Sequence, residues 1–228
     1  MSPDGIADRL SAYSDRLRSG SITRAKALWS TWRSYNDSLN PLRSAEVPRH
    51  RGAGAVDLLA SAALHESIII IVRAFARPGR GGVLQTNRVS FPILAELSTI
   101  NGVRDELEAR ARRWHPDGLR EDENARGSME ALDRMVSRID GLLVEDPNRQ
   151  QRLRNFRDEF LAHNLEIEVK RESPVFRDIT ELLDELTHLS DDAEFAFSGN
   201  HLDWGVFNDQ AKENAESLWE VIRRGAQA

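Results

Sequence analysis

The 228-residue sequence contains no cysteine, and this absence excludes disulfide bonds, thiolate metal sites and a cysteine nucleophile. A chain without disulfides fits a reducing compartment, so we expect a cytoplasmic protein. Lysine is nearly as scarce, because only three of the 31 basic residues are lysines and the others are arginines. The lysines are Lys26, Lys170 and Lys212. The net charge of −6 argues against nonspecific binding to nucleic acid by bulk electrostatics. Any contact with phosphate groups must therefore depend on a local group of arginines.

Long uninterrupted apolar runs are also missing. The N-terminal sequence MSPDGIADRL lacks the basic start and apolar run of a signal peptide. The most apolar segment, residues 53–76, is interrupted by Asp57, His65, Glu66 and Arg73. A membrane span needs roughly 18 to 20 apolar residues, so this segment predicts a buried helix, and we expect no membrane partner.

The spacing of apolar residues favours helices along most of the chain, because these residues recur every three or four positions. No segment has alternation of period two long enough for a sheet. The spacing therefore predicts an all-α fold in a single domain, with a multi-helix bundle over 53–225 and an N-terminal helical extension over 1–46. Residues 4–38 are predicted to form one long helix or two shorter ones with a break at Gly20 and Ser21. The other predicted helices cover residues 55–77, 90–114, with a join at Asn101 and Gly102, 124–144, 148–164, 174–189 and 206–224, and residues 194–205 are predicted to be irregular.

Three arginines precede a histidine by a similar number of residues, and chance alone predicts about two such pairs in a chain of this composition. The pairs are Arg43 with His50, Arg110 with His115, and Arg157 with His163. The first spans Pro48 in a predicted loop, and the second lies at a helix end, where a capping role is expected. The third lies on an amphipathic helix in the sequence RLRNFRDEFLAHN, so its context favours a functional site.

At these residues the chain resembles the HEPN superfamily of helical ribonucleases and nucleotide-binding domains, and particularly its AbiU-like abortive-infection branch. The family motif is an arginine, a polar residue, several further residues and a histidine, matched here by Arg157, Asp158 and His163. The segments ALHESIIIIVRAFAR and VSFPILAELSTI resemble helices of the same branch, and the resemblance covers residues 20–165. It implies that the predicted bundle is HEPN-like.

The resemblance also implies a homodimer in which two copies of the motif meet and cleave an RNA substrate without a metal or cofactor. Arg157 would bind the phosphate, and His163 would take the proton of a ribose 2′-hydroxyl or protonate the departing 5′-oxygen, which leaves a 2′,3′-cyclic phosphate. Histidine suits this work because its ordinary pKa lies near about 6.5. Asn155, Asp158 and Asn164 are candidates for supporting roles. Three further arginines could follow the RNA backbone or form a solvated face: Arg149, Arg152 and Arg154.

Two positions depart from the family pattern. Asp158 stands where asparagine is commoner in active members, and Leu165 stands where some toxins carry a tyrosine that an antitoxin modifies. Leu165 gives no support to that kind of regulation, although an antitoxin or defence partner of another kind is compatible with the branch. The function predicted is an endoribonuclease of phage defence or a toxin. The alternatives are a noncatalytic HEPN-like scaffold that binds nucleotide, RNA or protein, and an unrelated helical interaction module.

Other polar groups favour a structural role. His65 and Glu66 lie together in the apolar helix, where a buried polar pair is expected to satisfy itself by hydrogen bonds. Asp191, Asp192 and Glu194 could bind a hard cation, but the surrounding sequence is not a calcium loop and favours a solvated turn.

Overall fold

The computed structural model describes residues 1–38, 53–79, 81–85, 87–115, 117–145, 147–158 and 175–227, and within these ranges the regular structure is entirely helical. The all-α prediction is therefore confirmed. The α-helices are α1 (Pro3–Leu17), α2 (Thr23–Ser38), α4 (Ala53–Ala74), α5 (Gly82–Gln85), α6 (Phe91–Ser98), α7 (Val103–Ala111), α8 (Glu121–Glu145), α9 (Pro147–Phe156), α10 (Phe176–Ser198) and α11 (Trp204–Gln227).

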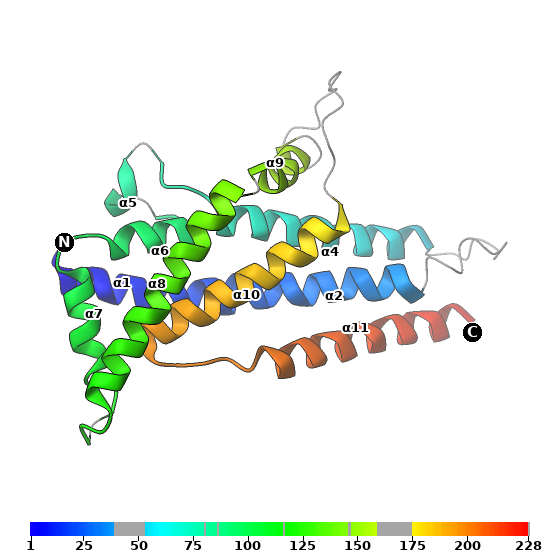
Figure 1. The fold of residues 1–228 in the computed structure, drawn as a ribbon. Coiled ribbons are helices and arrows are strands. Elements are labelled where there is room, and N and C mark those ends of the chain that lie inside the picture. The colour runs from blue at the N-terminus through cyan, green and yellow to red at the C-terminus, as the bar shows by residue number, and fades with distance from the viewer. Residues whose placement is uncertain are drawn as a thin grey trace.

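Helices α1 and α2 follow one another without a break at Gly20 and Ser21, which agrees with the alternative of one long helix. A π-helical segment, Arg18–Ile22, joins them, and Figure 1 shows the pair running along the length of the bundle. The side chain of Ile22 is fully buried, and the Thr23 hydroxyl donates to the carbonyl of Ser19 at 2.9 Å. Burial on one side and a local hydrogen bond on the other therefore keep the chain helical where its glycine and serine favour a break.

The first two helices share one hydrophobic core with the rest of the bundle. Ile6 and Leu10 of α1 are buried in the same cluster as residues of α6, α7 and α10, and α2 packs between α4 and α11. On the surface, the Arg110 guanidinium of α7 binds the carboxylates of Asp4 and Asp8 in α1. Arg110, which precedes His115 in one of the three Arg/His pairs, therefore connects α7 to α1 through ion pairs.

Helix α4 is buried along only part of its length. Ile68, Ile71 and Phe75 near its C-terminal end are buried, which confirms the helix rather than a strand at the run of isoleucines. Near its N-terminal end, Leu58 and Leu59 are 72% and 52% exposed. Among the described residues, Gly54–Ala74 is the one helix long and apolar enough to cross a membrane, with 39% of the apolar window buried. Core helices of soluble proteins also meet this criterion, and α4 packs on α2, α9 and α10.

The prediction for residues 194–205 was wrong in its first part, because α10 continues to Ser198. Phe197 is 5% exposed, and the surrounding apolar residues extend the buried face of α10, which favours helix over an irregular loop. The predicted join at Asn101 and Gly102 is confirmed, since Gly102 separates α6 from α7 with a φ of 78°.

The end of α10 generates a stability prediction. Gly199 has a φ of 71°, and a Cβ atom there would lie 2.7 Å from Cε3 of Trp114. We expect Gly199→Ala to lower the free energy of unfolding by about 2 kcal/mol, because it adds backbone strain and a steric clash. Gly54→Ala is the control, since its Cβ would meet nothing within 4 Å, and it should be neutral or stabilising by roughly 0.5 kcal/mol. Urea unfolding measures both, and equal stability of the two variants would contradict the packing described.

Candidate functional site

Helix α9 leads directly into the described part of the candidate motif, and its apolar residues hold it on the bundle. Leu153 is 1% exposed and lies in a small apolar gap with Ile71, Phe75 and Leu182. One turn later, the ring of Phe156 lies 5.7 Å from the ring of His65 in α4. Figure 1 shows α9 nearly end-on, crosswise to α4 and beside the first turns of α10. Arg157 and Asp158 follow α9 in a π-helical turn, a geometry often found at functional sites.

Arg152 connects α9 to α10 through a two-pronged ion pair. Its Nε and Nη2 atoms donate to the two carboxylate oxygens of Asp178 at 2.8 and 2.6 Å. The Asp178 side chain is 5% exposed and also accepts the backbone N–H of Val175 at the start of α10. Such a bidentate pair fixes the angle between the helices. The guanidinium of Arg152, predicted to follow RNA, is therefore directed at the protein interior.

Two other guanidinium groups lie within electrostatic range of the guanidinium of Arg154. The pKa of the Arg154 guanidinium is lowered, first by burial and then by the positive charges of Arg77 and Arg157, while Asp158 opposes the change. The Arg154 side chain also lies beside Phe75, and Phe75 precedes Arg77 by two residues in the sequence. We call Arg77, Arg154 and Arg157 the arginine cluster. Like charges brought together favour an anionic ligand, because such a ligand relieves their repulsion.

The candidate phosphate-binding arginine has an internal partner. Nε of Arg157 donates to Oδ1 of Asp158 at 2.7 Å, and Nη2 lies 2.5 Å from the same oxygen. Both side chains are partly exposed, at 35% and 44%, so water screens the pair. A phosphate group can therefore compete with Asp158 for this guanidinium, at the cost of breaking an exposed ion pair.

The remaining predicted residues are distributed as follows. The side-chain oxygen of Asn155 accepts a hydrogen bond from Nε2 of Gln151 at 2.7 Å, one turn earlier in α9. Arg149 lies in α9, but its side chain is outside the described part of the structure. His163 and Asn164 lie outside the described residues. The catalytic role of His163 therefore stays a prediction.

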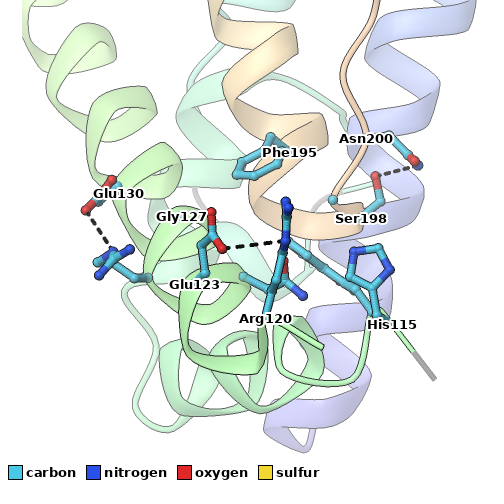
Figure 2. Close-up of a pocket in the computed structure, with 12 residues that line it drawn as sticks. His115, Arg120, Glu123, Gly127, Glu130, Phe195, Ser198 and Asn200 are labelled. Carbon is cyan, nitrogen blue, oxygen red and sulfur yellow. Dashed lines mark hydrogen bonds and ion pairs between the residues drawn. The ribbon is translucent and has the colours of Figure 1, made fainter. Parts of the chain in front are cut away.

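A separate cavity lies away from α9. It has a volume of about 520 Å³ and lies between the N-terminal half of α8 and the C-terminal end of α10 (Figure 2). Arg120 and Glu123 form an ion pair across it at 3.8 Å, and Arg126 pairs with Glu130 at 3.9 Å. From Glu130 to the end of α8, where α9 begins, the helix rises about 22 Å. Its charges are nearly balanced, so this cavity favours an anion less than the arginine cluster does.

A comparison with known families identifies the chain. A family model described as AbiU2, a HEPN family, matches residues 7–218, from the first turns of α1 into α11. The chain belongs to the HEPN AbiU2 family. No curated protein and no solved structure matches it. As a member of this family, the chain is an abortive-infection-related HEPN domain.

In this HEPN domain, sequence reasoning missed Arg77. The residue follows α4 and lies near Arg154 only because α9 crosses the C-terminal end of that helix. A signal was present, since ALHESIIIIVRAFAR resembled a family helix and ends at Arg77. The residue types gave no reason to prefer Arg77 over the neighbouring Arg73.

Two polar groups of the HEPN domain have partners other than those considered from the sequence. Glu66 forms an ion pair with Arg24 at 3.3 Å, and His65 lies against Phe156. Burial lowers the pKa of the His65 imidazole.

The three acidic residues considered for a cation lie in α10 rather than in a turn. Each of them pairs with a different basic residue: Asp191 with His201, Asp192 with Arg134, and Glu194 with Arg18.

The ion pair between α9 and α10 generates a second stability prediction. We expect Arg152→Met to lower the free energy of unfolding by about 3 kcal/mol, because it leaves the buried Asp178 carboxylate without its cation. Arg104→Met is the matched control. Its partner Asp133 is 61% exposed, so the loss should not exceed about 1 kcal/mol. Chemical unfolding of both variants tests this, and losses of the same size would show that the α9 contact is no stronger than a surface pair.

Proposed function

We propose that this HEPN domain is a metal-independent endoribonuclease that cleaves RNA to a 2′,3′-cyclic phosphate, in phage defence or as a toxin, in the cytoplasm. The observation that supports the proposal is the arginine cluster, which gathers positive charge where α9 leads into the family motif at Arg157. The protein as a whole is acidic, with a net charge of −6. A local concentration of guanidinium groups on such a protein supports a phosphate-binding role for this region.

In the proposed reaction, Arg157 leaves Asp158 and binds the scissile phosphate. His163 takes the proton of the 2′-hydroxyl, whose oxygen attacks phosphorus while the bond to the 5′-oxygen breaks. An imidazolium then protonates the departing 5′-oxygen. Arg157 stabilises the negative charge that develops on the phosphorane oxygens. The products are a 2′,3′-cyclic phosphate and a 5′-hydroxyl end, and no metal is required.

A homodimer is part of the proposal. On the helix that the sequence predicts over 148–164, residues six positions apart would point about 120° away from each other, so Arg157 and His163 of one copy would not share a helix face. A second copy with twofold symmetry supplies the missing group and a second imidazole. The exposed Leu58 lies on the same face of α4 as His65, which contacts α9. This apolar surface beside α9 is available for the association.

A noncatalytic scaffold is the second candidate function, and the pair between Arg157 and Asp158 is the observation that favours it. A carboxylate that neutralises Arg157 also repels phosphate. In a scaffold of this kind, an antitoxin or defence partner would bind the domain, and RNA would be held without cleavage. The two functions differ in their products, so a cleavage assay separates them.

The nuclease proposal predicts RNA cleavage in the presence of EDTA, with 2′,3′-cyclic phosphate ends. His163→Ala should reduce the rate by at least about 100-fold, because it removes the general base. His115→Ala is the matched control, since His115 is exposed at the distant cavity and should be dispensable. Fragment ends are identified by mass spectrometry. RNA that is bound but left intact by the wild-type protein would establish the scaffold instead.

The internal partner of Arg157 yields a second prediction. Asp158→Asn should increase affinity for RNA by roughly fivefold, about 1 kcal/mol, because it frees the guanidinium and removes a like charge from the phosphate. Asp209→Asn changes the charge by the same amount on an exposed position of α11 and serves as the control. Fluorescence anisotropy with a 2′-O-methyl RNA measures binding without cleavage. Weaker binding by Asp158→Asn than by the control would mean that Asp158 helps to hold the ligand.

A further inference from the structure

Arg77 lies outside the family motif, but the backbone before it is held in place. The carbonyl of Ala76 accepts a hydrogen bond from the Ser90 hydroxyl at 2.5 Å, and Ser90 is fully buried. The N–H of Ala76 donates to the carbonyl of Arg73 at the end of α4, at 3.1 Å. The Arg77 side chain is exposed, and none of the described carboxylates forms an ion pair with it. Arg77 is therefore a cation on a fixed backbone with its charge available to a ligand.

Arg154 connects Arg77 to the motif. Its side chain lies with Val72 and Phe75 of α4 on one side, and it is half-buried. Three residues later on the same side of α9 comes Arg157, whose charge Arg154 senses together with that of Arg77. The arginine cluster thus runs from the end of α4, through Arg154, to the motif arginine, and its one described carboxylate, Asp158, is at the motif end.

We propose that Arg77 and Arg154 form a second phosphate subsite that binds the phosphate next to the scissile one in single-stranded RNA. This inference rests on the proposed function, because it assigns the scissile phosphate to Arg157. It restricts the substrate to RNA with at least two phosphate groups. Arg77 binds substrate and takes no part in proton transfer.

The physical advantage of such a subsite is positioning. Contacts with the neighbouring phosphate hold the scissile phosphate close to Arg157. This helps the scissile phosphate to replace Asp158 as the partner of the Arg157 guanidinium. A single phosphate has to displace Asp158 without that help. A ligand with two linked phosphates should therefore bind more tightly than two separate phosphates do, because the two subsites lie side by side where α9 crosses the end of α4.

The test is binding of 2′-O-methyl oligonucleotides, which lack the 2′-hydroxyl needed for cleavage. A dinucleotide has one phosphodiester and a trinucleotide has two. We expect Arg77→Gln to weaken trinucleotide binding by roughly fivefold, to lower the slope of log affinity against log salt by about 0.7, and to reduce the advantage in affinity of the trinucleotide over the dinucleotide. Arg113→Gln, a 71% exposed arginine after α7, is the control and should match the wild type. Calorimetry at several salt concentrations measures all of these.

Further variants separate the outcomes. Arg77→Ala should behave like Arg77→Gln, and Arg77→Lys should restore the salt slope, since it restores the charge. Trinucleotide binding by Arg77→Gln and Arg77→Ala equal to that of the wild type would overturn the subsite, while cleavage of RNA by the wild type would leave the nuclease proposal standing. A wild-type protein that neither cleaves RNA nor binds either oligonucleotide would overturn both.

Discussion

The attachment of α9 to the bundle is the interaction on which the candidate site depends. Leu153 fixes the depth of α9 against α4, and the bidentate pair of Arg152 with Asp178 fixes its direction against α10. With depth and direction set, the next residues of the helix have no freedom of position. Arg154 lies with Val72 and Phe75 at the end of α4, and Arg157 follows α9 with its side chain partly exposed. A short polar helix thereby acquires a defined geometry that its own propensity would not provide.

The consequence is electrostatic. Most arginines in this acidic protein are paired with carboxylates on neighbouring turns or helices, as Arg110 is with Asp4 and Asp8. In the arginine cluster, the like charges of Arg77 and Arg157 raise the electrostatic energy of the Arg154 guanidinium, and the Asp158 carboxylate opposes them. Asp158 stabilises the site without a ligand and competes with a phosphate that enters. In the proposed function, the balance between these two effects sets how tightly a phosphate group binds to Arg157.

Much of the fold could be predicted from the sequence, because apolar spacing reports directly on buried helix faces. The stripe in 124–144 and the segment 55–77 correspond to α8 and α4. The errors arose where packing overrides local preference. Residues 194–198 extend α10 because Phe197 packs into the core. At Gly20 the sequence left one helix or two open, and the buried Ile22 nearby keeps the chain helical.

The candidate site was only partly predictable. Arg157 and Asp158 were found because a family motif places them together in sequence. Arg152 could not be separated from Arg154, since the two differ only in the direction in which each leaves the helix, toward Asp178 or toward the end of α4. Arg77 depends on the crossing of two helices far apart in the chain, which no local pattern encodes.

The most direct measurement is a crystal structure of the protein with a bound 2′-O-methyl oligonucleotide. The account predicts a phosphate group in hydrogen-bond contact with the guanidinium of Arg157, with Asp158 displaced from it and the RNA backbone continuing along the arginine cluster. An oligonucleotide bound instead at the cavity of Arg120 and Glu123, with Arg157 still paired to Asp158, would contradict it.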